Sequence, residues 1–330
     1  MSTPVISVLM TVFNAGRFFE PSIRSILDQT FRNFEFLIVD DASTDGSAEV
    51  AEAWAERDPR IRLIRNAENK GQTKCLNQGL QLARGEWIAR QDADDLAHPW
   101  RLAKQHRFLT IQPGIVLLGS SGRIIDEHDR LAGLLDAPLS QHSIAWTSPF
   151  LNPFMHTSVM FRANVVRDQF GGYSEDYRIA QDYELWTRLI ASHQAANLPQ
   201  RLVCYRHLAT SLSKSGRSAA FAEAAEVSAR EAKRIFGRDL SERETGLIAA
   251  FREGLDPSNR RAFWELYGEL LSDCGPRADD IARTVALHHL KAAGALSSKA
   301  LRPAIAEILT ALRVDFGATL RWLATRYFNT

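Results

Sequence analysis

The 330-residue chain has few cysteines and almost no net charge. Its three cysteines, Cys75, Cys204 and Cys274, are far apart and form no Cys-x-x-Cys pair. This pattern argues against a zinc site and against a disulfide framework, and a reducing compartment fits it best. The formal net charge of +1 gives no reason to expect nucleic acid as a partner.

Long hydrophobic runs are also missing. No stretch approaches the ~20 apolar residues that are needed to cross a bilayer. The N-terminal residues 1–14 lack a basic segment, and Ser7, Thr11 and Asn14 interrupt their apolar run, which is unlike a signal peptide. We therefore expect a cytoplasmic protein, and peripheral contact with the inner face of the cell membrane stays open.

The composition is that of an ordinary soluble globular protein, with 45% hydrophobic and 24% charged residues. The length is large for one core and suits one main domain with a smaller appendage. We place the main domain at residues 1–215 and a helical C-terminal region at 216–330.

The first 95 residues alternate between short β-branched runs and longer amphipathic stretches. Such alternation predicts βαβ units in a mostly parallel, twisted sheet that helices cover on both faces. The expected strands are 5–12, 34–40, 61–65 and 86–90, and the expected helices are 18–31, 46–57 and 73–84.

The middle of the chain has a mixed pattern, and the last third is helical. Helices are expected at 99–110 and 181–192, a strand at 157–162, and two strands around a Ser-Ser-Gly turn within 115–126. Beyond about residue 215 the strand signal disappears. Residues 218–236 favour a helix, 254–259 a break, and the remainder more helices.

Carboxylates follow two of the predicted strands. Asp40 and Asp41 end one strand, and Asp92, Asp94 and Asp95 follow another. In such sheets ligands bind beyond the carboxyl ends of the strands. Helix capping is an equal alternative for Asp40, but one cap does not explain three acids in four positions.

Clustered Asp oxygens without His or Cys suit hard cations. Mg²⁺ is usually held by one or two carboxylates together with substrate phosphates. No phosphate-binding glycine loop of the GxxxxGK[ST] or GxGxxG type follows the first strand, which disfavours P-loop and dinucleotide folds. The motif DADD therefore indicates a Mg²⁺ or Mn²⁺ ion that bridges to a diphosphate.

Five ordered segments carry a resemblance to a known family. They are SVLMTVFNAGRFFEPSIRSILDQTF, FEFLIVDDASTDGS, NAENKGQTKCLNQGLQLARGEWIARQDADD, HTSVMFR and QDYELWTRL. In this order they resemble the inverting glycosyltransferases of family 2, which have the GT-A fold. The resemblance covers roughly residues 5–215 and implies a nucleotide-sugar donor.

The resemblance also implies roles for the residues at the strand ends. Thr11 and Phe13 would flank the nucleotide base, and Asp41 would accept a hydrogen bond from a uracil or similar base. Asp92 would reach the ribose or the metal, and Asp94 would ligate the metal. The remaining acid of DADD, Asp95, would support the loop.

The general base that the resemblance implies is Asp182, which follows Gln181 where the family often has Glu. An inverting transfer needs one base to take the proton of the acceptor hydroxyl as its oxygen attacks the anomeric carbon. The alternative for Asp182 is a helix N-cap.

Four further residues are candidates for the diphosphate or the acceptor. His156 precedes a predicted strand, and Arg206 lies in a segment that resembles the family's late Tyr-Arg motif. In this chain the histidine, His207, comes directly after the arginine, which puts a ligand role for it in doubt. Lys74 and Arg90 are also phosphate candidates, with simple surface exposure as the alternative.

The C-terminal segment 303–328 predicts a basic amphipathic helix with one apolar stripe. The stripe comprises Ile305, Ile308, Leu309, Leu312, Phe316, Leu320, Leu323 and Tyr327. It could pack on its own domain, on a second subunit in a homodimer, or on an anionic membrane.

We therefore expect a metal-dependent inverting transferase for a hexosyl or N-acetylhexosaminyl group. Its donor would be a UDP-sugar, its acceptor a glycan or a lipid-linked molecule, and its pathway surface polysaccharide biosynthesis. The alternative is a catalytically silent scaffold that binds nucleotide sugars. A nucleotidyltransferase would need a glycine-rich basic loop, which TVFNAGRFF does not convincingly supply. Processive synthesis would need membrane-spanning helices, so transfer of single residues is expected.

Overall fold

The computed structural model describes residues 3–208, 217–273, 284–285 and 288. The chain divides into two compact units, one of residues 1–137 and 154–220, the other of residues 138–153 and 221–330. The predicted boundary at 215/216 falls outside the described residues and stays a prediction. The two units are described separately below.

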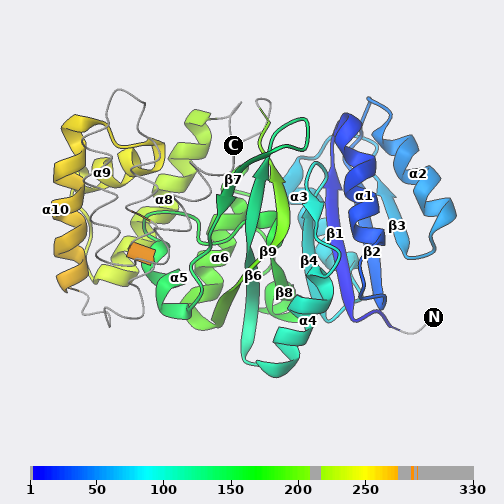
Figure 1. The fold of residues 1–330 in the computed structure, drawn as a ribbon, viewed down its shortest axis with the longest axis horizontal. Helices are drawn as coiled ribbons and strands as arrows, with labels where there is room; N and C mark the ends of the chain where they lie inside the picture. The colour runs from blue at the N-terminus through cyan, green and yellow to red at the C-terminus, as the bar shows by residue number, and fades with distance from the viewer. Residues whose placement is uncertain (1–2, 209–216, 274–283, 286–287, 289–330) are drawn as a thin grey trace. The chain divides into compact units, whose positions relative to one another are not determined.

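The first unit contains a nine-stranded sheet in the order β3-β2-β1-β4-β8-β6-β9-β5, with β7 paired to β6 (Figure 1). The strands are β1 Ile6–Val12, β2 Phe34–Asp40, β3 Ile61–Arg65, β4 Trp87–Asp92, β5 Leu96–Ala97, β6 Ile115–Ile125, β7 Leu131–Leu135, β8 Met160–Arg162 and β9 Gln194–Arg206.

The strands β3, β2, β1 and β4 are mutually parallel, so their carboxyl ends lie at one edge of the sheet. Thr11 on β1 is paired with Asp92 on β4, and Val12 with Asp40 on β2. Every residue of β1 and β2 is buried, which explains their continuous apolar sequences. The predicted α/β class, with a mostly parallel sheet, is confirmed.

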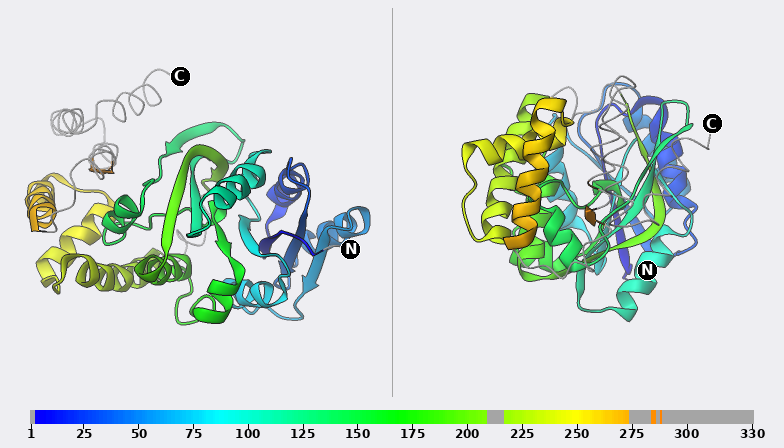
Figure 2. Two further views of the ribbon diagram at one scale, coloured as in Figure 1. Left: turned by 90° about the horizontal axis from the view of Figure 1, so that it is seen from below. Right: turned by 60° about the vertical axis from the view of Figure 1, so that its left-hand side comes forward.

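Helices cover both faces of this sheet (Figure 2). They are α1 Phe19–Leu27, α2 Ser47–Arg57, α3 Gln72–Leu82, α4 Arg101–Ile111 and α6 Gln181–Ser192. Val8 and Met10 pack in one core with Ile23 of α1, whereas Leu9, on the opposite face of β1, meets Gly79 of α3. The alternation of side chains along β1 therefore places a hydrophobic layer on each face.

The predicted turn within 115–126 is wrong, because β6 runs without interruption through Ser120, Ser121 and Gly122. Both serines are fully buried. A Cβ atom on Gly122 would lie 2.7 Å from Cε of Met155 and 3.2 Å from Cγ2 of Val203. The small residues thus allow close packing within the sheet and do not form a turn.

Two other parts of the sheet differ from the sequence prediction. The strand expected at 157–162 begins only at Met160, because a 3₁₀ turn occupies residues 156–158. The long strand β9 was not predicted, although it pairs with β6 along ten positions and ends at the candidate residue Arg206.

The second unit is helical in its described residues, as the sequence predicts for this region. Its helices are α5 Gln141–Thr147, α8 Arg217–Phe236, α9 Glu242–Glu253 and α10 Pro257–Asp273. Their core is aromatic: Phe251 and Phe263 stack at 4.6 Å, and Trp146 donates a 2.7 Å hydrogen bond to the Tyr267 hydroxyl. The expected break at 254–259 is shorter than predicted, because α10 already begins at Pro257, where a proline is tolerated.

No helix in the described ranges is both long and apolar enough to cross a membrane. The predicted amphipathic segment 303–328 lies outside the described residues, as does Cys274.

Candidate active site

The carboxyl end of β1 brings Thr11 and Phe13 to the edge of the sheet. Thr11 is buried beside β4, and its hydroxyl accepts a 3.3 Å hydrogen bond from Arg90. Phe13 is 52% exposed, because the chain turns away at Asn14, which has a positive φ of 54°. An exposed ring at this position has a free face for a planar base to stack on.

Asp41, one residue beyond β2, is held by protein donors. Its carboxylate accepts hydrogen bonds from Asn66 Nδ2 at 3.0 Å, Lys70 N at 2.9 Å and Gly71 N at 2.8 Å. Burial favours the neutral acid, but these hydrogen bonds together with one from Cys75 outweigh it and lower the pKa of Asp41. Asp41 thus fixes the loop that leads into α3, and its predicted contact with a base stays a prediction.

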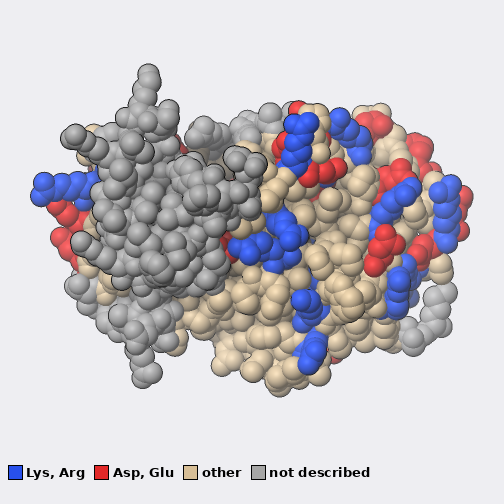
Figure 3. All heavy atoms as spheres, in the orientation of Figure 1, with Lys and Arg blue, Asp and Glu red and all other residues tan. Residues whose placement is uncertain are grey.

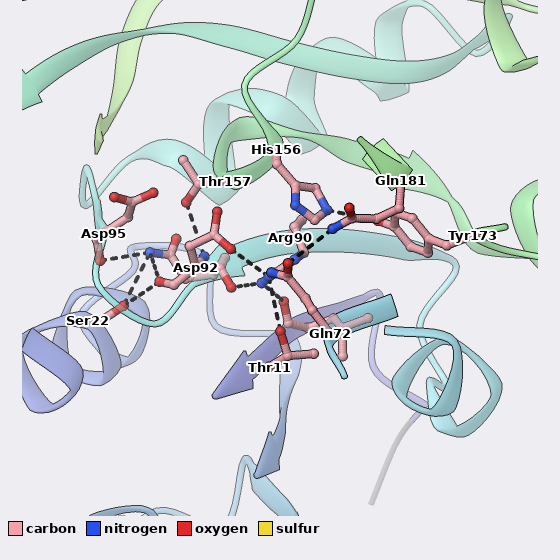
Figure 4. A network of polar contacts seen from close by, with 12 residues as sticks. Thr11, Ser22, Gln72, Arg90, Asp92, Asp95, His156, Thr157, Tyr173 and Gln181 are labelled. Atoms are coloured by element: carbon pink, nitrogen blue, oxygen red, sulfur yellow. Dashed lines mark hydrogen bonds and ion pairs between the residues drawn. The ribbon is translucent and has the colours of Figure 1, made fainter. Parts of the chain in front are cut away.

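Asp92, the last residue of β4, forms an ion pair that the sequence did not reveal. Arg90 is completely buried, and its Nη2 lies 2.6 Å from Oδ1 of Asp92. The same guanidinium donates to the carbonyl groups of Leu9 and Gln91 (Figure 4). Surface exposure is therefore ruled out as the explanation for Arg90, which instead ties the end of β4 to β1.

Asp94 and Asp95 carry the strongest electrostatic perturbation at this edge. Burial, and then the charge of Asp92, raise the pKa of Asp94 to about 6. Burial, followed by the charges of Asp92 and Asp94, raises the pKa of Asp95 well above its usual range. The three acids of DADD thus repel one another in a poorly solvated loop.

Asp95 has a structural position, in line with the support that the resemblance implies. It is 1% exposed, and its Oδ1 accepts a 2.6 Å hydrogen bond from the backbone N–H of Arg206. Its side chain therefore points away from solvent and joins the DADD loop to the end of β9.

Arg206, at the end of β9, also holds the DADD loop. Its guanidinium donates from Nε to the Asp94 carbonyl at 2.8 Å and from Nη1 to the Asp126 carbonyl at 3.0 Å. It pairs with Asp129 at 2.6 Å and lies over the ring of Phe18. With the side chain 1% exposed, Arg206 acts here as a clamp, and its predicted contact with a diphosphate stays a prediction.

His156 and Thr157 reach the same loop from the 3₁₀ turn before β8. The Thr157 hydroxyl accepts a 3.2 Å hydrogen bond from the backbone N–H of Asp92. His156 Nε2 lies 3.1 Å from the Tyr173 hydroxyl (Figure 4). Burial and the nearby Arg90 lower the pKa of His156 to about 3, so its imidazole is neutral at physiological pH. It can line a pocket, but it supplies no positive charge.

Asp182 occupies the first turn of α6 but is not its N-cap. The N-cap is Ala180, and Asp182 lies two positions inside the helix. Its Oδ1 accepts a 2.7 Å hydrogen bond from Tyr183 N. The capping alternative for Asp182 is thus not what the helix shows, although the positive end of the helix still favours a carboxylate there.

Two tyrosines connect Asp182 with DADD electrostatically. Burial raises the pKa of Tyr205 to about 12, and four carboxylates contribute to the rise. They are Asp95, Asp92, Asp94 and Asp182. Burial also raises the pKa of Tyr173, where both Asp182 and Asp92 add to the effect. The candidate base Asp182 and the candidate metal ligand Asp92 therefore act on both hydroxyl groups, and Asp94 acts on that of Tyr205.

The remaining candidate, Lys74, is exposed on α3, and its predicted contact with a diphosphate stays a prediction. The site residues that sequence reasoning missed are Tyr173, Tyr205 and Thr157, together with the pairing of Arg90. The signal for Arg90 was present, because an arginine in a fully buried strand two residues before an acid needs a charged partner.

The donor set of DADD fits a divalent cation. Within the described ranges no three or more His, Cys, Asp or Glu side chains converge as a complete protein-only metal site. Asp92 and Asp94 alone would supply two carboxylates, the number that Mg²⁺ takes when phosphates complete its coordination. The raised pKa of Asp94 indicates a carboxylate whose charge the protein does not compensate, and a cation would supply that compensation.

Comparisons with known proteins agree with the fold. The model of glycosyl transferase family 2 matches residues 7–166. An uncharacterized glycosyltransferase of Haemophilus influenzae is 33% identical over 62% of this chain and 65% of its own length. The O-antigen biosynthesis glycosyltransferase WbnJ of Escherichia coli is 32% identical over 69% of this chain and 88% of its own.

Two solved structures have a similar fold at low sequence identity. The structure of S. aureus TarS residues 1–349 in complex with UDP-GlcNAc is 18% identical, with a TM-score of 0.58, and the match covers 96% of this chain and 92% of that one. The mannosyltransferase PcManGT of Pyrobaculum calidifontis, in complex with GDP-Man and Mn²⁺, is 19% identical, with a TM-score of 0.53 over 100% and 89% of the chains. The chain therefore belongs to glycosyl transferase family 2 and is a glycosyltransferase with the GT-A fold.

Proposed function

We propose that this chain transfers a single sugar, with inversion, from a UDP-sugar to a hydroxyl group of a glycan or lipid-linked acceptor in surface polysaccharide biosynthesis. The observation that carries the proposal is that Asp182, in the first turn of α6, lies close enough to Asp92 and Asp94 for all three charges to act on the Tyr205 hydroxyl. Asp182 therefore lies near the candidate metal ligands Asp92 and Asp94 but on a different element. An inverting transfer requires such a separate acid to take the proton of the acceptor hydroxyl.

The nucleotide would lie at the ends of β1 and β2. Phe13 would stack on the base, Thr11 would lie beside it, and Asp41 would accept a hydrogen bond from it. Asp92 and Asp94 would hold a divalent cation, Mn²⁺ or Mg²⁺, which would neutralise charge on the diphosphate. The UDP-sugar assignment is supported by the neighbour structure with UDP-GlcNAc, and the cation by the neighbour with Mn²⁺.

Asp182 would act on the acceptor. As the acceptor oxygen forms its bond to the anomeric carbon, its proton passes to the Asp182 carboxylate, and the bond from that carbon to the diphosphate breaks with its electron pair. Tyr173 and His156 are neutral at this wall of the site, so they can orient hydroxyl groups without competing for the proton.

The biosynthetic context rests on the names of relatives. One is an O-antigen biosynthesis enzyme and another, from Erwinia amylovora, an amylovoran biosynthesis glycosyltransferase that is 33% identical over 75% of its length. The chain spans about two thirds of the length of two further relatives, 65% and 67%.

The decisive experiment is the replacement Asp182→Asn. Loss of a general base typically lowers the rate by roughly 10²–10⁴-fold, so transfer should fall by that factor while UDP and Mn²⁺ binding by calorimetry stay unchanged. Asp168→Asn, an exposed acid paired with its neighbour Arg167, is the matched control and should transfer at the wild-type rate.

A thermal-shift panel of UDP-, GDP- and dTDP-sugars, with and without Mn²⁺, identifies the donor to be used, because a ligand of the folded state raises its stability. Unaltered turnover of Asp182→Asn would refute the assignment of the base. A wild-type protein that binds the donor but never consumes it, even by slow hydrolysis, would instead support a binding scaffold.

A further inference from the structure

The outer face of α4 exposes apolar and basic side chains in one stripe. Trp100, which caps the helix, is followed on the same side by Lys104, Arg107 and Ile111, at spacings of four, three and four residues. Trp100 is 54% and Ile111 64% exposed, and both basic residues are exposed as well. Large apolar residues at both ends of an exposed basic stripe are unusual for a helix whose other face is already packed.

The inner face of α4 packs the helix on the sheet. Leu102 and Leu109 are buried in the main core, and the Gln105 amide donates to the carbonyl groups of Leu118 and Ser158. Neither Trp100 nor Ile111 is therefore required to hold the helix on the sheet.

The charge around this stripe has one sign. Residues 96–125 contain no Asp or Glu. Among the described residues Lys104, Arg107 and Arg123 have no acidic partner, whereas the exposed Arg65, for example, pairs with Glu52. Figure 3 shows Lys and Arg spheres among tan ones over the region where Figure 1 draws β6 and α4.

Arg123 belongs to the same patch as α4. Arg123 on β6 is aligned with Cys204 on β9, which is aligned with Leu96 on β5, two residues before His98. In agreement, burial lowers the pKa of His98, and the charges of Arg123 and Lys104 lower it further. The adjoining segment 28–33, whose Phe31 packs on His106, contributes one acid and one base. The net charge of the patch is therefore clearly positive.

We propose that this patch, Trp100, Lys104, Arg107, Ile111 and Arg123, docks on an anionic lipid surface. Protein interfaces are depleted of lysine, and here Lys104 lies between the two apolar residues. A lipid surface instead takes up tryptophan and isoleucine at the boundary between headgroups and acyl chains while its charge attracts the basic residues. The patch is distinct from the C-terminal segment 303–328.

The patch lies close to the carboxylate cluster along the chain. Trp100 comes five positions after Asp95, so their Cα atoms are at most about 18 Å apart. If the proposed function holds, docking would bring the DADD loop within reach of a lipid-linked acceptor. Vesicle binding itself does not depend on that function.

The experiment is co-sedimentation of the full chain with vesicles in which about a third of the phosphatidylcholine is replaced by anionic phosphatidylglycerol. Each basic residue near such a surface strengthens binding by roughly fivefold. The variant K104E/R107E should therefore bind at least about 25-fold more weakly, and Trp100→Ala about tenfold more weakly. Neutral vesicles should bind little wild-type protein.

The matched control is R57E/R243E, which reverses the charge of two exposed arginines on α2 and α9 and changes the net charge equally. It should keep wild-type vesicle binding, and all variants should keep the wild-type midpoint of urea unfolding and UDP-sugar binding. Equal losses in both double variants, no preference for anionic vesicles, or a dimer in sedimentation that Trp100→Ala dissociates would each overturn the proposal.

Discussion

Two acidic segments lie at the same edge of one sheet, and the pKa values of their carboxyl groups are shifted in opposite directions. At the end of β2, Asp41 is held by backbone and side-chain donors that lower its pKa, and Asp45 likewise accepts hydrogen bonds from Gly16 N and Ser47 N. At the end of β4, Asp94 and Asp95 have raised pKa values, because burial and mutual repulsion exceed the few donors available.

The different pKa shifts indicate that the two segments have different roles. A carboxylate whose charge is already satisfied by N–H groups fixes loops and presents a defined acceptor to a ligand. A buried carboxylate cluster without sufficient compensation costs stability in the free protein and favours a bound cation. Similar residues at equivalent strand ends thus hold loops in place at β2 and leave uncompensated charge at β4, where we propose that a cation binds.

Arg90 is completely buried and forms an ion pair with Asp92 of the second segment, so its removal should have the largest effect. Arg90→Met leaves Asp92 without its partner and Leu9 without its donor. Removing one member of a buried pair costs about 3 kcal/mol or more of unfolding free energy. Urea unfolding at neutral pH measures this loss.

The control for Arg90 is the double variant R90M/D92N. It has no unpaired charge and should recover a substantial part of the lost stability, as a coupled pair requires. If the losses of unfolding free energy in Arg90→Met and Asp92→Asn simply add in the double variant, the ion pair does not stabilise the protein. The proposed contrast between the two acidic segments would then lose its main support.

Asp41→Asn should have the next largest effect. One carboxylate oxygen becomes an amide nitrogen, which cannot accept from Gly71 N or, in the other orientation, from Lys70 N. An unsatisfied buried donor and the lost charge together cost about 2 kcal/mol. Asp126→Asn is the control, because Asp126 accepts similar backbone hydrogen bonds at an exposed turn and should change stability little. Equal losses in both variants would contradict a special role for the first segment.

The parallel half of the fold could be predicted because its strands are buried on both faces and leave continuous apolar runs. Strands β2 and β3 and helix α6 have the boundaries that the sequence indicates. The other half could not, since serine and glycine signal a turn and close packing alike. In β6, Gly122 packs against Met155 and Val203, a contact between distant segments that no local pattern encodes.

The same limit applies to the site. That acids gather at the strand ends follows from the order of strands and the parallel pairing. Which acids are compensated does not, because the donors come from elsewhere in the chain: Asn66 and residues 70–71 serve Asp41, and Arg206 serves Asp95. Asp94 and Asp41 therefore look alike in sequence and differ only in the folded chain.

The pH dependence of the unfolding free energy, measured without metal, tests the difference between Asp94 and Asp41. We expect it to give the smallest of the three effects. Asp94 has a raised pKa, so the folded state holds its proton more tightly, and the protein loses stability as pH rises from about 4 to about 6. A pKa of about 6 in place of 3.8 corresponds to at most about 3 kcal/mol of unfolding free energy, and partial solvation reduces this to about 1–2 kcal/mol. Asp94→Asn should therefore gain on wild type by about that amount between pH 4 and pH 7 in EDTA.

Asp41 should show the reverse sign, because its lowered pKa gives stability that is present above about pH 4 and lost on further acidification. The deficit of Asp41→Asn relative to wild type should therefore shrink as pH falls below about 4. Urea unfolding of both variants across this range provides the measurement. If Asp94→Asn gained nothing on wild type between pH 4 and pH 7, the charge of Asp94 would be compensated within the protein, and the case for a cation at DADD would fall with it.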